Sequence, residues 1–484
     1  MTDARGQRTV LVVAVLASFV AFLDGSIVTV ALPAVADDLG GALTLQQWVV
    51  DAYLLTLGSL MLVAGSLSDT FGRVRVLRAG LVAFGATSLL AALAPDPGLL
   101  ITARALQGVA AALLVPSSLA LITSTFSGPA QGRAIGRWTA WTGVAFLVGP
   151  LAGGGLADTL GWRWVFGVVV VPVVLTLVLT TRLPDDAHRG TPDAPARIDV
   201  AGAVLAAVGL AGPVFALIEG QRVGFGTGIV LVPLVVGAAS LVGFVWWERR
   251  APQPMMPLDL FRTREFAVGN LATVGLYAAL NLGTLTIPLV VQELAGLSAT
   301  LAGLVTLPTT IVSLLFSTLF GTLAATHGPR LFMTVGPLVT AGGFLWMLLV
   351  REPIDVWWQV VPGVVLFGLG LAITVAPLTS AVLSQVPPAR SGIASAVNNA
   401  ISRVAGLVAV AFLGVVLGGA LTVDGFHRVV VVVAVLLGAS ALVSFVGLRG
   451  SRRASSQPRV VAGAGSGSGS SGHDVPPDRG ASGS

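Results

Sequence analysis

A carboxyl group stands deep inside the first long apolar run of this sequence. Asp24 lies within residues 10–35, about 14 residues into the run, which is ~21 Å along a helix axis and beyond the middle of a bilayer. An ionised, unpaired carboxylate costs several kcal/mol at such a depth, so this group should bind a proton and exchange it when water reaches it. Such an acid can trade a proton for a substrate. The alternative is a carboxylate that only locks two helices together.

Arg104 and Gln107 form a second polar feature, inside the apolar run 99–123. An arginine within a membrane span is tolerated when it faces a polar cavity or a partner. Gln107 follows one turn later on the same helix face. We expect both side chains to relay or tune protons together with Asp24. The alternative is a structural arginine that hydrogen-bonds backbone carbonyls.

Four more polar residues are candidates for proton coupling or substrate binding. Asp51 lies in the outer part of the second run, where it could also simply face an outer vestibule, and Glu293 lies near the outer end of the ninth. Asn399 and Arg403 belong to the segment SAVNNAISRVAG of the thirteenth run. Ionisable groups within spans mark functional sites by default.

The residue types exclude several other kinds of chemistry. The chain has no cysteine, and its four histidines lie in loops or the tail without the spacing of metal ligands. It has no lysine either, so it lacks the lysine of a phosphate-binding P-loop. We therefore expect no enzyme activity, no metal and no cofactor, with an ion gradient as the energy source. The isoelectric point near 10.9 does not indicate a nucleic-acid partner, because the arginines are scattered through short loops.

The elements that must position these residues are membrane-spanning helices. Hydrophobic residues make up 55% of the 484 residues and charged residues 10%, whereas soluble domains average about 25% charged residues. The apolar runs approach the ~20 residues that cross a bilayer as a helix, and they lack the ~10-residue alternating pattern of barrel strands. The composition therefore predicts an all-α integral membrane protein.

Fourteen apolar runs bounded by proline, glycine or charge are candidate spans. They predict an N-terminal six-helix half at 10–181, two extra central helices at 200–247, which Pro213 and Pro233 interrupt, and a C-terminal six-helix half at 266–448. A short N-terminus at 1–9, polar linkers at 182–199 and 248–265, and a disordered Gly/Ser/Pro-rich tail at 449–484 complete the chain. The predicted spans are 10–35, 45–64, 77–94, 99–123, 134–156, 163–181, 200–218, 228–247, 266–291, 299–323, 331–349, 359–383, 397–420 and 428–448.

The distribution of arginine predicts the orientation of the spans. With a cytoplasmic N-terminus, 21 of the 27 arginines fall in cytoplasmic segments, 4 in outer loops and 2 within spans. Cytoplasmic loops carry the excess of basic residues in membrane proteins. We therefore predict that both termini are cytoplasmic. The first run is too long for a signal peptide and carries Asp24, so we expect no cleavage.

A short repeat links the two halves. The chain reads GSLSDTFGR from Gly65 and GTLAATHGPR from Gly321, each time on a short connection after the second span of a half. Internal repeats of this kind build many secondary transporters, whose substrate path lies between the halves.

Four motifs in the first half resemble those of the major facilitator superfamily, and within it the fourteen-span drug:proton antiporters. The run LDGSIVTVALP from Leu23 is similar to the family's first-span motif, with serine and threonine in place of threonine and asparagine. GSLSDTFGRVRVL from Gly65 is similar to the loop motif, although Thr70 and Val74 stand where basic residues are usual. The fourth-span motif is matched by RALQG from Arg104, and the fifth-span antiporter motif by GPLAGG from Gly149, with WRWVF following.

The resemblance implies a fold of two six-helix halves plus two extra central helices, and proton-coupled efflux of amphipathic or cationic small organic molecules. It further implies a monomer in the inner membrane of a bacterium, whose partners are substrate, protons and lipid. A dedicated exporter of one metabolite or lipid, and a non-transporting sensor on the same fold, stay open as alternatives.

Two of these motifs are expected to gate the transport pathway. The loop residues Gly65, Asp69, Gly72 and Arg73 can make and break a charged cluster between conformations, or serve as a topology signal only. The residues Gly149, Pro150, Gly153 and Gly154 give the fifth span a smooth, kinked face that can seal one side of the pathway, or provide a generic packing face.

Overall fold

The computed structural model describes residues 4–448 except 184–198, 253, 384–385 and 387–389. The predicted tail and most of the predicted linker 182–199 therefore lie outside the described residues. No strand is present among the described residues, and they belong to one compact unit, Met1–Gly450. The all-α prediction is confirmed.

The first part of the chain folds into eight α-helices and one 3₁₀ turn. Glycines with positive φ separate several of them: Gly72 (φ +94°) lies between α3 and α4, a conformation that a side chain disfavours. Asp96 caps α5 by accepting a hydrogen bond from the Leu99 amide at 3.0 Å. The elements are α1 (Ala4–Ile27), η1 (Val28–Val30), α2 (Leu32–Leu39), α3 (Ala42–Phe71), α4 (Arg73–Ala92), α5 (Pro97–Thr125), α6 (Gly128–Thr159), α7 (Arg163–Gly167) and α8 (Val170–Thr180).

The rest of the chain is equally helical. Positive-φ glycines again end helices, at Gly224 and Gly418, and Ser298 caps α12 through the Leu301 amide at 3.3 Å. The elements are α9 (Val200–Val223), α10 (Gly228–Glu248), η2 (Leu258–Arg262), α11 (Arg264–Leu289), the π-helical turn η3 (Val290–Leu294), α12 (Ala299–His327), α13 (Pro329–Trp346), η4 (Met347–Leu349), α14 (Val356–Gln359), α15 (Val361–Leu383), α16 (Ser391–Leu417) and α17 (Val423–Gly447).

Thirteen stretches of the described residues are long and apolar enough to cross a membrane. The chain is therefore a multi-pass membrane protein. The remaining predicted span, 45–64, lies in α3, whose 30 residues reach ~45 Å as a helix. The predicted span 163–181 is less regular than expected, since it is divided into α7 and α8. Pro213 and Pro233, by contrast, lie inside continuous helices.

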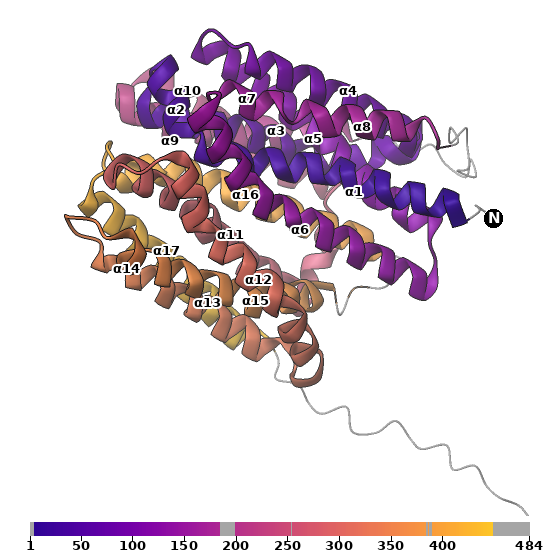
Figure 1. Cartoon of the computed structure of the whole chain (residues 1–484). Coiled ribbons are helices and arrows are strands. Elements are labelled where there is room, and N and C mark those ends of the chain that lie inside the picture. The colour runs from indigo at the N-terminus through magenta and orange to yellow at the C-terminus, as the bar shows by residue number, and fades with distance from the viewer. Residues whose placement is uncertain (1–3, 184–198, 253, 384–385, 387–389, 449–484) are drawn as a thin grey trace, which may run out of the picture. The chain divides into compact units, whose positions relative to one another are not determined.

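Two bundles make up the described structure (Figure 1). In the first, α5 packs against α3, α4 and α1, while α6 packs against α1. In the second, α15 packs against α12 and α13, and α17 packs against α11 and α13. The bundles meet along two helix pairs, α6 with α12 and α3 with α16.

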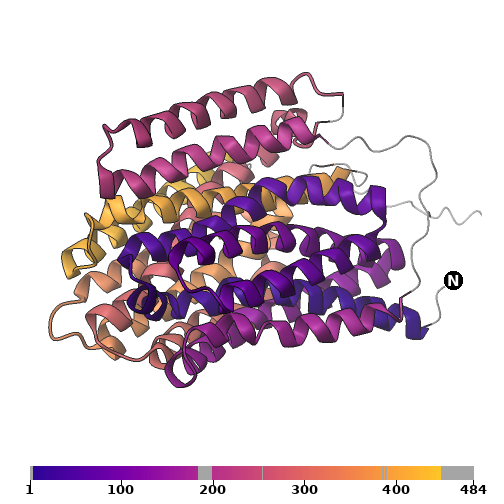
Figure 2. The ribbon, with the colours of Figure 1, turned by 90° about the horizontal axis from the view of Figure 1, so that it is seen from above.

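The two extra helices form an antiparallel pair, α9 and α10 (Figure 2). A Cβ on Gly212 would lie 2.0 Å from the Pro233 carbonyl oxygen, and one on Gly237 would lie 2.5 Å from the Pro213 Cδ. Only glycine allows such contacts, so these residues let the helices approach closely at their prolines. Helix α9 also packs against α3 and α16, which places the pair beside the junction of the two bundles.

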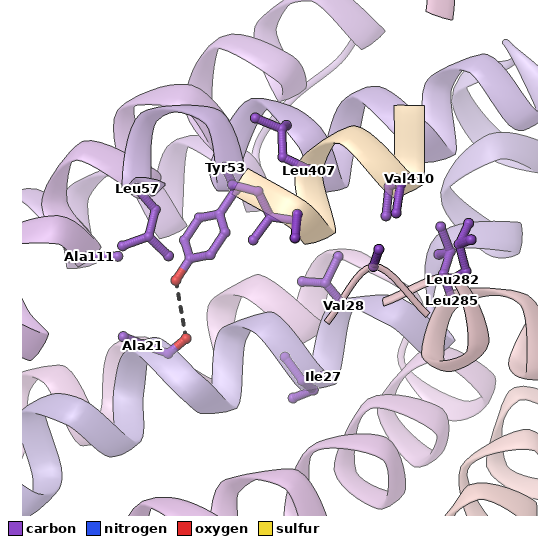
Figure 3. Packing of buried hydrophobic residues seen from close by; sticks show 14 of the residues in the cluster. Ala21, Ile27, Val28, Tyr53, Leu57, Ala111, Leu282, Leu285, Leu407 and Val410 are labelled. Atoms are coloured by element: carbon purple, nitrogen blue, oxygen red, sulfur yellow. Dashed lines mark hydrogen bonds between the residues drawn. The ribbon is translucent and has the colours of Figure 1, made fainter. Parts of the chain in front are cut away.

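Apolar side chains from both bundles meet near the middle of α3 (Figure 3). The Tyr53 hydroxyl donates a hydrogen bond to the Ala21 carbonyl of α1 at 3.2 Å. Leu407 and Val410 of α16, and Leu282 and Leu285 of α11, belong to the same buried cluster.

Candidate functional site

Asp24 and Arg104 form a buried ion pair between α1 and α5. The Asp24 Oδ2 and Arg104 Nη1 atoms are 2.6 Å apart, and the two side chains are 0% and 2% exposed. In the described structure the Asp24 carboxylate is therefore held by a neighbouring helix.

Gln107 completes this constellation. Its Nε2 donates to Asp24 Oδ1 and to Ser88 Oγ of α4, each at 2.8 Å, and its Oε1 accepts from Arg104 Nη1 at 2.6 Å. Both oxygens of the Asp24 carboxylate are therefore hydrogen-bonded. The three residues that the sequence analysis expected to act together therefore lie in contact.

Arg104 is positioned by α3 as well. Its Nε donates to the Val49 carbonyl at 2.9 Å, and its guanidinium lies 4.4 Å from the centre of the Tyr53 ring. A Cβ on Gly108 would lie 2.3 Å from the Tyr53 carbonyl oxygen, so the glycine of the RALQG motif lets α5 come close enough to α3 for these contacts.

Asp51 is buried without a hydrogen-bond partner. Its side chain is 0% exposed, and within the described part of the chain neither carboxylate oxygen is hydrogen-bonded. One turn earlier on α3, Gln47 Nε2 donates to the Val410 carbonyl of α16 at 2.7 Å. Asp51 thus follows a residue that contacts the second half, and it is buried instead of facing a vestibule.

A cavity of about 190 Å³ lies between the two bundles. Helices α1, α3, α5 and α6 line it on one side and α11, α12, α15 and α16 on the other. Its lining is mostly apolar and aromatic, with hydroxyl and amide groups and two arginines, Arg104 and Arg403, but no carboxylate among the residues that line it. Arg104 therefore touches the cavity with one side and Asp24 with the other.

Arg403 reaches this cavity from α16. Its guanidinium lies 5.5 Å from the centre of the Phe22 ring of α1, and its buried Nε has no hydrogen-bond partner among the described residues. A Cβ on Gly58 of α3 would lie 3.5 Å from the Arg403 Cβ. Arg403 therefore lines the cavity from the side opposite the first half.

Asn399 does not join the site. It is exposed, and its Nδ2 donates to the Ser395 carbonyl of its own helix at 3.0 Å. Asn398 instead donates to Asn270 Oδ1 and Thr273 Oγ1 of α11 at 3.0 and 2.9 Å. Successive residues of a helix point about 100° apart, so the expectation for Asn399 is corrected to a contact made by its neighbour.

Glu293 contacts the first half without lining the cavity. It lies in the π-helical turn η3, and its Oε1 accepts a hydrogen bond from Gln46 Nε2 of α3 at 2.9 Å. Nearby, Gln292 Nε2 donates to the Val30 carbonyl at 3.1 Å. The structure therefore places Glu293 in a polar contact between the two halves.

The fifth-span motif packs tightly against both halves. Cβ atoms on Gly149 and Gly153 would lie 2.0 Å from Ser26 Oγ and 2.4 Å from the Ile27 carbonyl oxygen of α1. On the other side, a Cβ on Gly154 would lie 2.4 Å from the Ala299 carbonyl oxygen of α12. The Pro150 carbonyl oxygen faces Gly303 of α12, where a Cβ would lie 2.4 Å away.

A carboxylate fastens the same end of this helix pair. Asp158 of α6 accepts hydrogen bonds from the Ala299 and Thr300 amides and from Thr300 Oγ1, at 3.1, 2.8 and 2.5 Å. It occupies the N-terminus of α12, where free amides and the helix dipole favour a negative charge. Together with the Gln46–Glu293 contact, these bonds hold the two halves together at the end where α3 and α12 begin.

The loop motif lies at the opposite end of α3. Gly72 provides the positive-φ break before α4, Arg73 begins that helix, and no atom lies within 4 Å of a Cβ placed on Gly65. The side chain of Asp69 lies outside the described residues.

Sequence reasoning missed two residues at these places. Asn281 lines the cavity from α11, and Asp158 joins the halves. Asn281 is a polar residue inside an apolar run, which is a usable signal. Asp158 stands at a span end, where acids are common, so its pattern alone does not distinguish it.

Comparison with known proteins shows which family the chain resembles. The model of the Major Facilitator Superfamily matches residues 14–410. The chain is 36% identical over 419 residues to the puromycin resistance protein pur8 of Streptomyces alboniger, covering 85% of this chain and 82% of that protein. It is 34% identical to the cephamycin export protein CmcT of Amycolatopsis lactamdurans, covering 85% of both, and 32% identical to the multidrug resistance protein Stp of Mycobacterium tuberculosis, covering 85% and 76%.

Solved structures of low sequence identity share the fold. A D-xylose–proton symporter superposes with a TM-score of 0.67 at 15% identity, covering 92% of this chain and 98% of that one. A peptide transporter superposes with a TM-score of 0.69 at 16% identity, covering 91% and 94%.

Proposed function

The chain belongs to the major facilitator superfamily, and we propose that it exports amphipathic or cationic small organic molecules in exchange for protons by alternating access. Like its relatives, it is a transporter and not an enzyme. The names of three relatives concern puromycin resistance, cephamycin export and multidrug resistance, which supports antibiotic-like substrates. The proton gradient then serves as the energy source, with no cofactor.

One observation carries the proposal: Arg104 lines the cavity while it holds the fully buried carboxylate of Asp24. The deprotonated pair is neutral overall, so the cavity beside it can accept a substrate with little charge. A proton that binds Asp24 removes the counter-charge of Arg104 and leaves a positive charge at the cavity wall. That charge disfavours a cationic or weakly basic substrate at short range, so proton and substrate exclude each other.

Asp51 supplies a second exchangeable proton in this proposal. A fully buried carboxyl with both oxygens unpaired is too costly to hold as an anion, so it is neutral in this conformation. It follows Gln47, which bonds to α16, and separation of α3 from α16 would bring water to it. The proton would then leave or enter as the halves move.

The gating residues act at the two ends of the pathway. At one end, Gly149, Pro150, Gly153 and Gly154 allow α6 to close against α1 and α12. The arginine distribution makes this the outer end, so the conformation is closed to the outside. The loop residues Gly65, Asp69, Gly72 and Arg73 would then act at the cytoplasmic end when the pathway opens outward.

The composition of the cavity favours amphipathic over multiply charged substrates. Its lining is largely apolar and aromatic, which favours the planar or hydrophobic groups of a substrate. Arg403 opposes high positive charge, and the lining contains no carboxylate to balance it. We place the protein as a monomer in a bacterial inner membrane, with both termini in the cytoplasm.

The direct test is substrate-induced proton release from purified protein. The detergent-solubilised chain in weak buffer is mixed with a panel of antibiotics and dyes while a pH indicator is followed. Substrates should release protons from wild type and release fewer from Asp24→Asn. If calorimetry shows that compounds of the panel bind but the indicator shows no proton release, the proposed proton coupling is wrong. No binding at all across the panel would favour a dedicated exporter or a sensor.

A further inference from the structure

The two extra helices carry a pair of carboxyl groups that the transport proposal does not use. Asp199 precedes α9 and Glu248 ends α10, and the Glu248 side chain is only 3% exposed. Helices α9 and α10 pack along each other, so the beginning of one and the end of the other are neighbours.

Each carboxyl group has one oxygen that is hydrogen-bonded and one that is not. Asp199 Oδ1 accepts from Trp247 Nε1 at 2.7 Å and from the Gly202 amide at 2.8 Å, and Glu248 Oε2 accepts from the Met256 amide at 3.0 Å. Asp199 Oδ2 and Glu248 Oε1 are buried and have no partner among the described residues.

The two unpartnered oxygens face the same point. A Cβ placed on Gly202 would lie 2.6 Å from Asp199 Oδ2 and 3.0 Å from Glu248 Oε1. Gly202 therefore leaves room for the two carboxyl groups to converge. Two ionised carboxylates at such a place would repel each other and would leave both oxygens unsatisfied.

Few other charges surround the pair in the described part of the chain. Arg249 and Arg250 follow Glu248, and the Arg250 guanidinium lies over the Trp246 ring at 4.2 Å. On the connection to α11, Asp259 is paired with Arg390 at 2.5 Å. On α9 itself, Glu219 and Arg222 lie at the far end of the helix and pair with each other. The helices packed against α9 carry Asp51 and Asp69 on α3 and Arg403 on α16. Arg197, before Asp199, lies outside the described residues.

We propose that Asp199 and Glu248 bind one proton between them, and that this proton holds the α10–α11 connection against α9. A single proton turns one carboxylate into a donor for the other, which satisfies both free oxygens and removes one of two like charges. The Met256 amide is then fixed to Glu248, so residues 249–252 and 254–263 stay docked. Loss of the proton as the pH rises leaves two buried negative charges, which draw in water and separate the pair.

Undocking would change an apolar pocket. Met255 and Met256 line it together with residues of α3, α9, α10, α11, α16 and α17, nearly all of which are apolar. Because the connection forms part of this wall, its release at high pH would open the pocket beside the junction of the two halves.

Hydrogen exchange measured by mass spectrometry tests this site without any transport substrate. The full chain in nanodiscs is labelled between about pH 6 and about pH 9, and exchange in residues 249–263 is corrected for the intrinsic pH dependence of amide exchange. Wild type should lose protection about tenfold or more across this range, since docking would fail once the pair is doubly ionised. Glu248→Gln keeps a donor and an acceptor in the same shape, so its protection should change by about twofold or less.

Two controls make the outcome decisive. Asp199→Asn should flatten the pH response as Glu248→Gln does, whereas Asp259→Asn, a carboxylate on the same connection, should leave the wild-type response intact. Equal pH responses of wild type and Glu248→Gln would overturn the proposal, as would a flattened response in Asp259→Asn. Restoration of wild-type protection at high pH by Na⁺, K⁺ or Mg²⁺ would assign a metal cation, not a proton, to the pair.

Discussion

The proposed use of a proton depends on single ionisable side chains. The Asp24–Arg104 pair is almost completely buried, and the cost of desolvating two charges can exceed the gain from pairing them. A buried pair is therefore weak evidence for stability, and the contact of Arg104 with the cavity supports our proposal that the pair exchanges a proton. Asp51 supports the proposal for a different reason: its carboxyl group is buried without a hydrogen-bond partner among the described residues, where the neutral form is favoured.

The state of Asp51 can be tested through stability. Asp51→Asn preserves shape and removes the titratable group, so the purified variant should unfold within about 1 kcal/mol of wild type if the native carboxyl is neutral. If instead the carboxylate is ionised and held by a partner, breaking that pair would cost about 3–5 kcal/mol. Thermal unfolding of both proteins in the same detergent at neutral pH separates the two results.

For single residues, the sequence predicts the depth in the membrane better than the direction in which the side chain points. Arg104 and Gln107 could be grouped because a one-turn spacing places them on a common helix face, and the structure brings both into contact with Asp24 of another helix. Asn399 could not be separated from Asn398 because the rotation of α16 depends on its packing against α11. For the same reason, nothing in the sequence revealed that Asp51 has no hydrogen-bond partner among the described residues.

In the proposed mechanism, helix pairs are the elements that open and close the pathway. The α6–α12 contact combines glycines in close approach with Asp158 at the N-terminus of α12. Such a contact is strong when closed and leaves no bulky side chains to rearrange when it opens.

A methyl group at this contact should shift the protein toward the outward-open state. Gly154→Ala places a Cβ 2.4 Å from the Ala299 carbonyl oxygen, whereas the neighbouring Gly155 has no atom within 4 Å of its Cβ position. The chain has no native cysteine, so spin labels at Thr159→Cys and Leu297→Cys can report the gap directly. The distance should lengthen in Gly154→Ala and stay at the wild-type value in Gly155→Ala; equal distances in all three proteins would contradict the gating role.

Element boundaries were predictable where glycine, proline or charge interrupts an apolar run. The prolines of α9 and α10 were misleading because Gly212 and Gly237 on the partner helices accommodate them. The division of α7 from α8 was not predicted, since the run 163–181 contains no strong interruption other than Pro172.

Two helix bundles meet around a cavity, and an extra helix pair lies beside their junction. Repeats and apolar runs predicted this architecture, because a bilayer leaves the chain few ways to satisfy its backbone. The size and lining of the cavity could not be predicted, since they depend on how helices distant in sequence are rotated against one another.

Orientation belongs to this scale and remains a prediction of the arginine distribution. Single cysteines introduced at Ala42 and at Phe71, exposed residues at opposite ends of α3, should differ in labelling by a membrane-impermeant maleimide. Intact cells should label the Ala42→Cys protein, and label the Phe71→Cys protein only after permeabilisation. The reverse pattern would place both termini outside.

We propose above all that a proton on Asp24 drives export. Proteoliposomes that hold the purified chain and a fluorescent substrate identified in the binding panel are given a pH gradient, and substrate movement is followed for wild type and Asp24→Asn. We expect gradient-driven transport by wild type and a loss of about a hundredfold or more in the variant, with substrate binding retained. Gradient-driven transport at the wild-type rate by Asp24→Asn would contradict it.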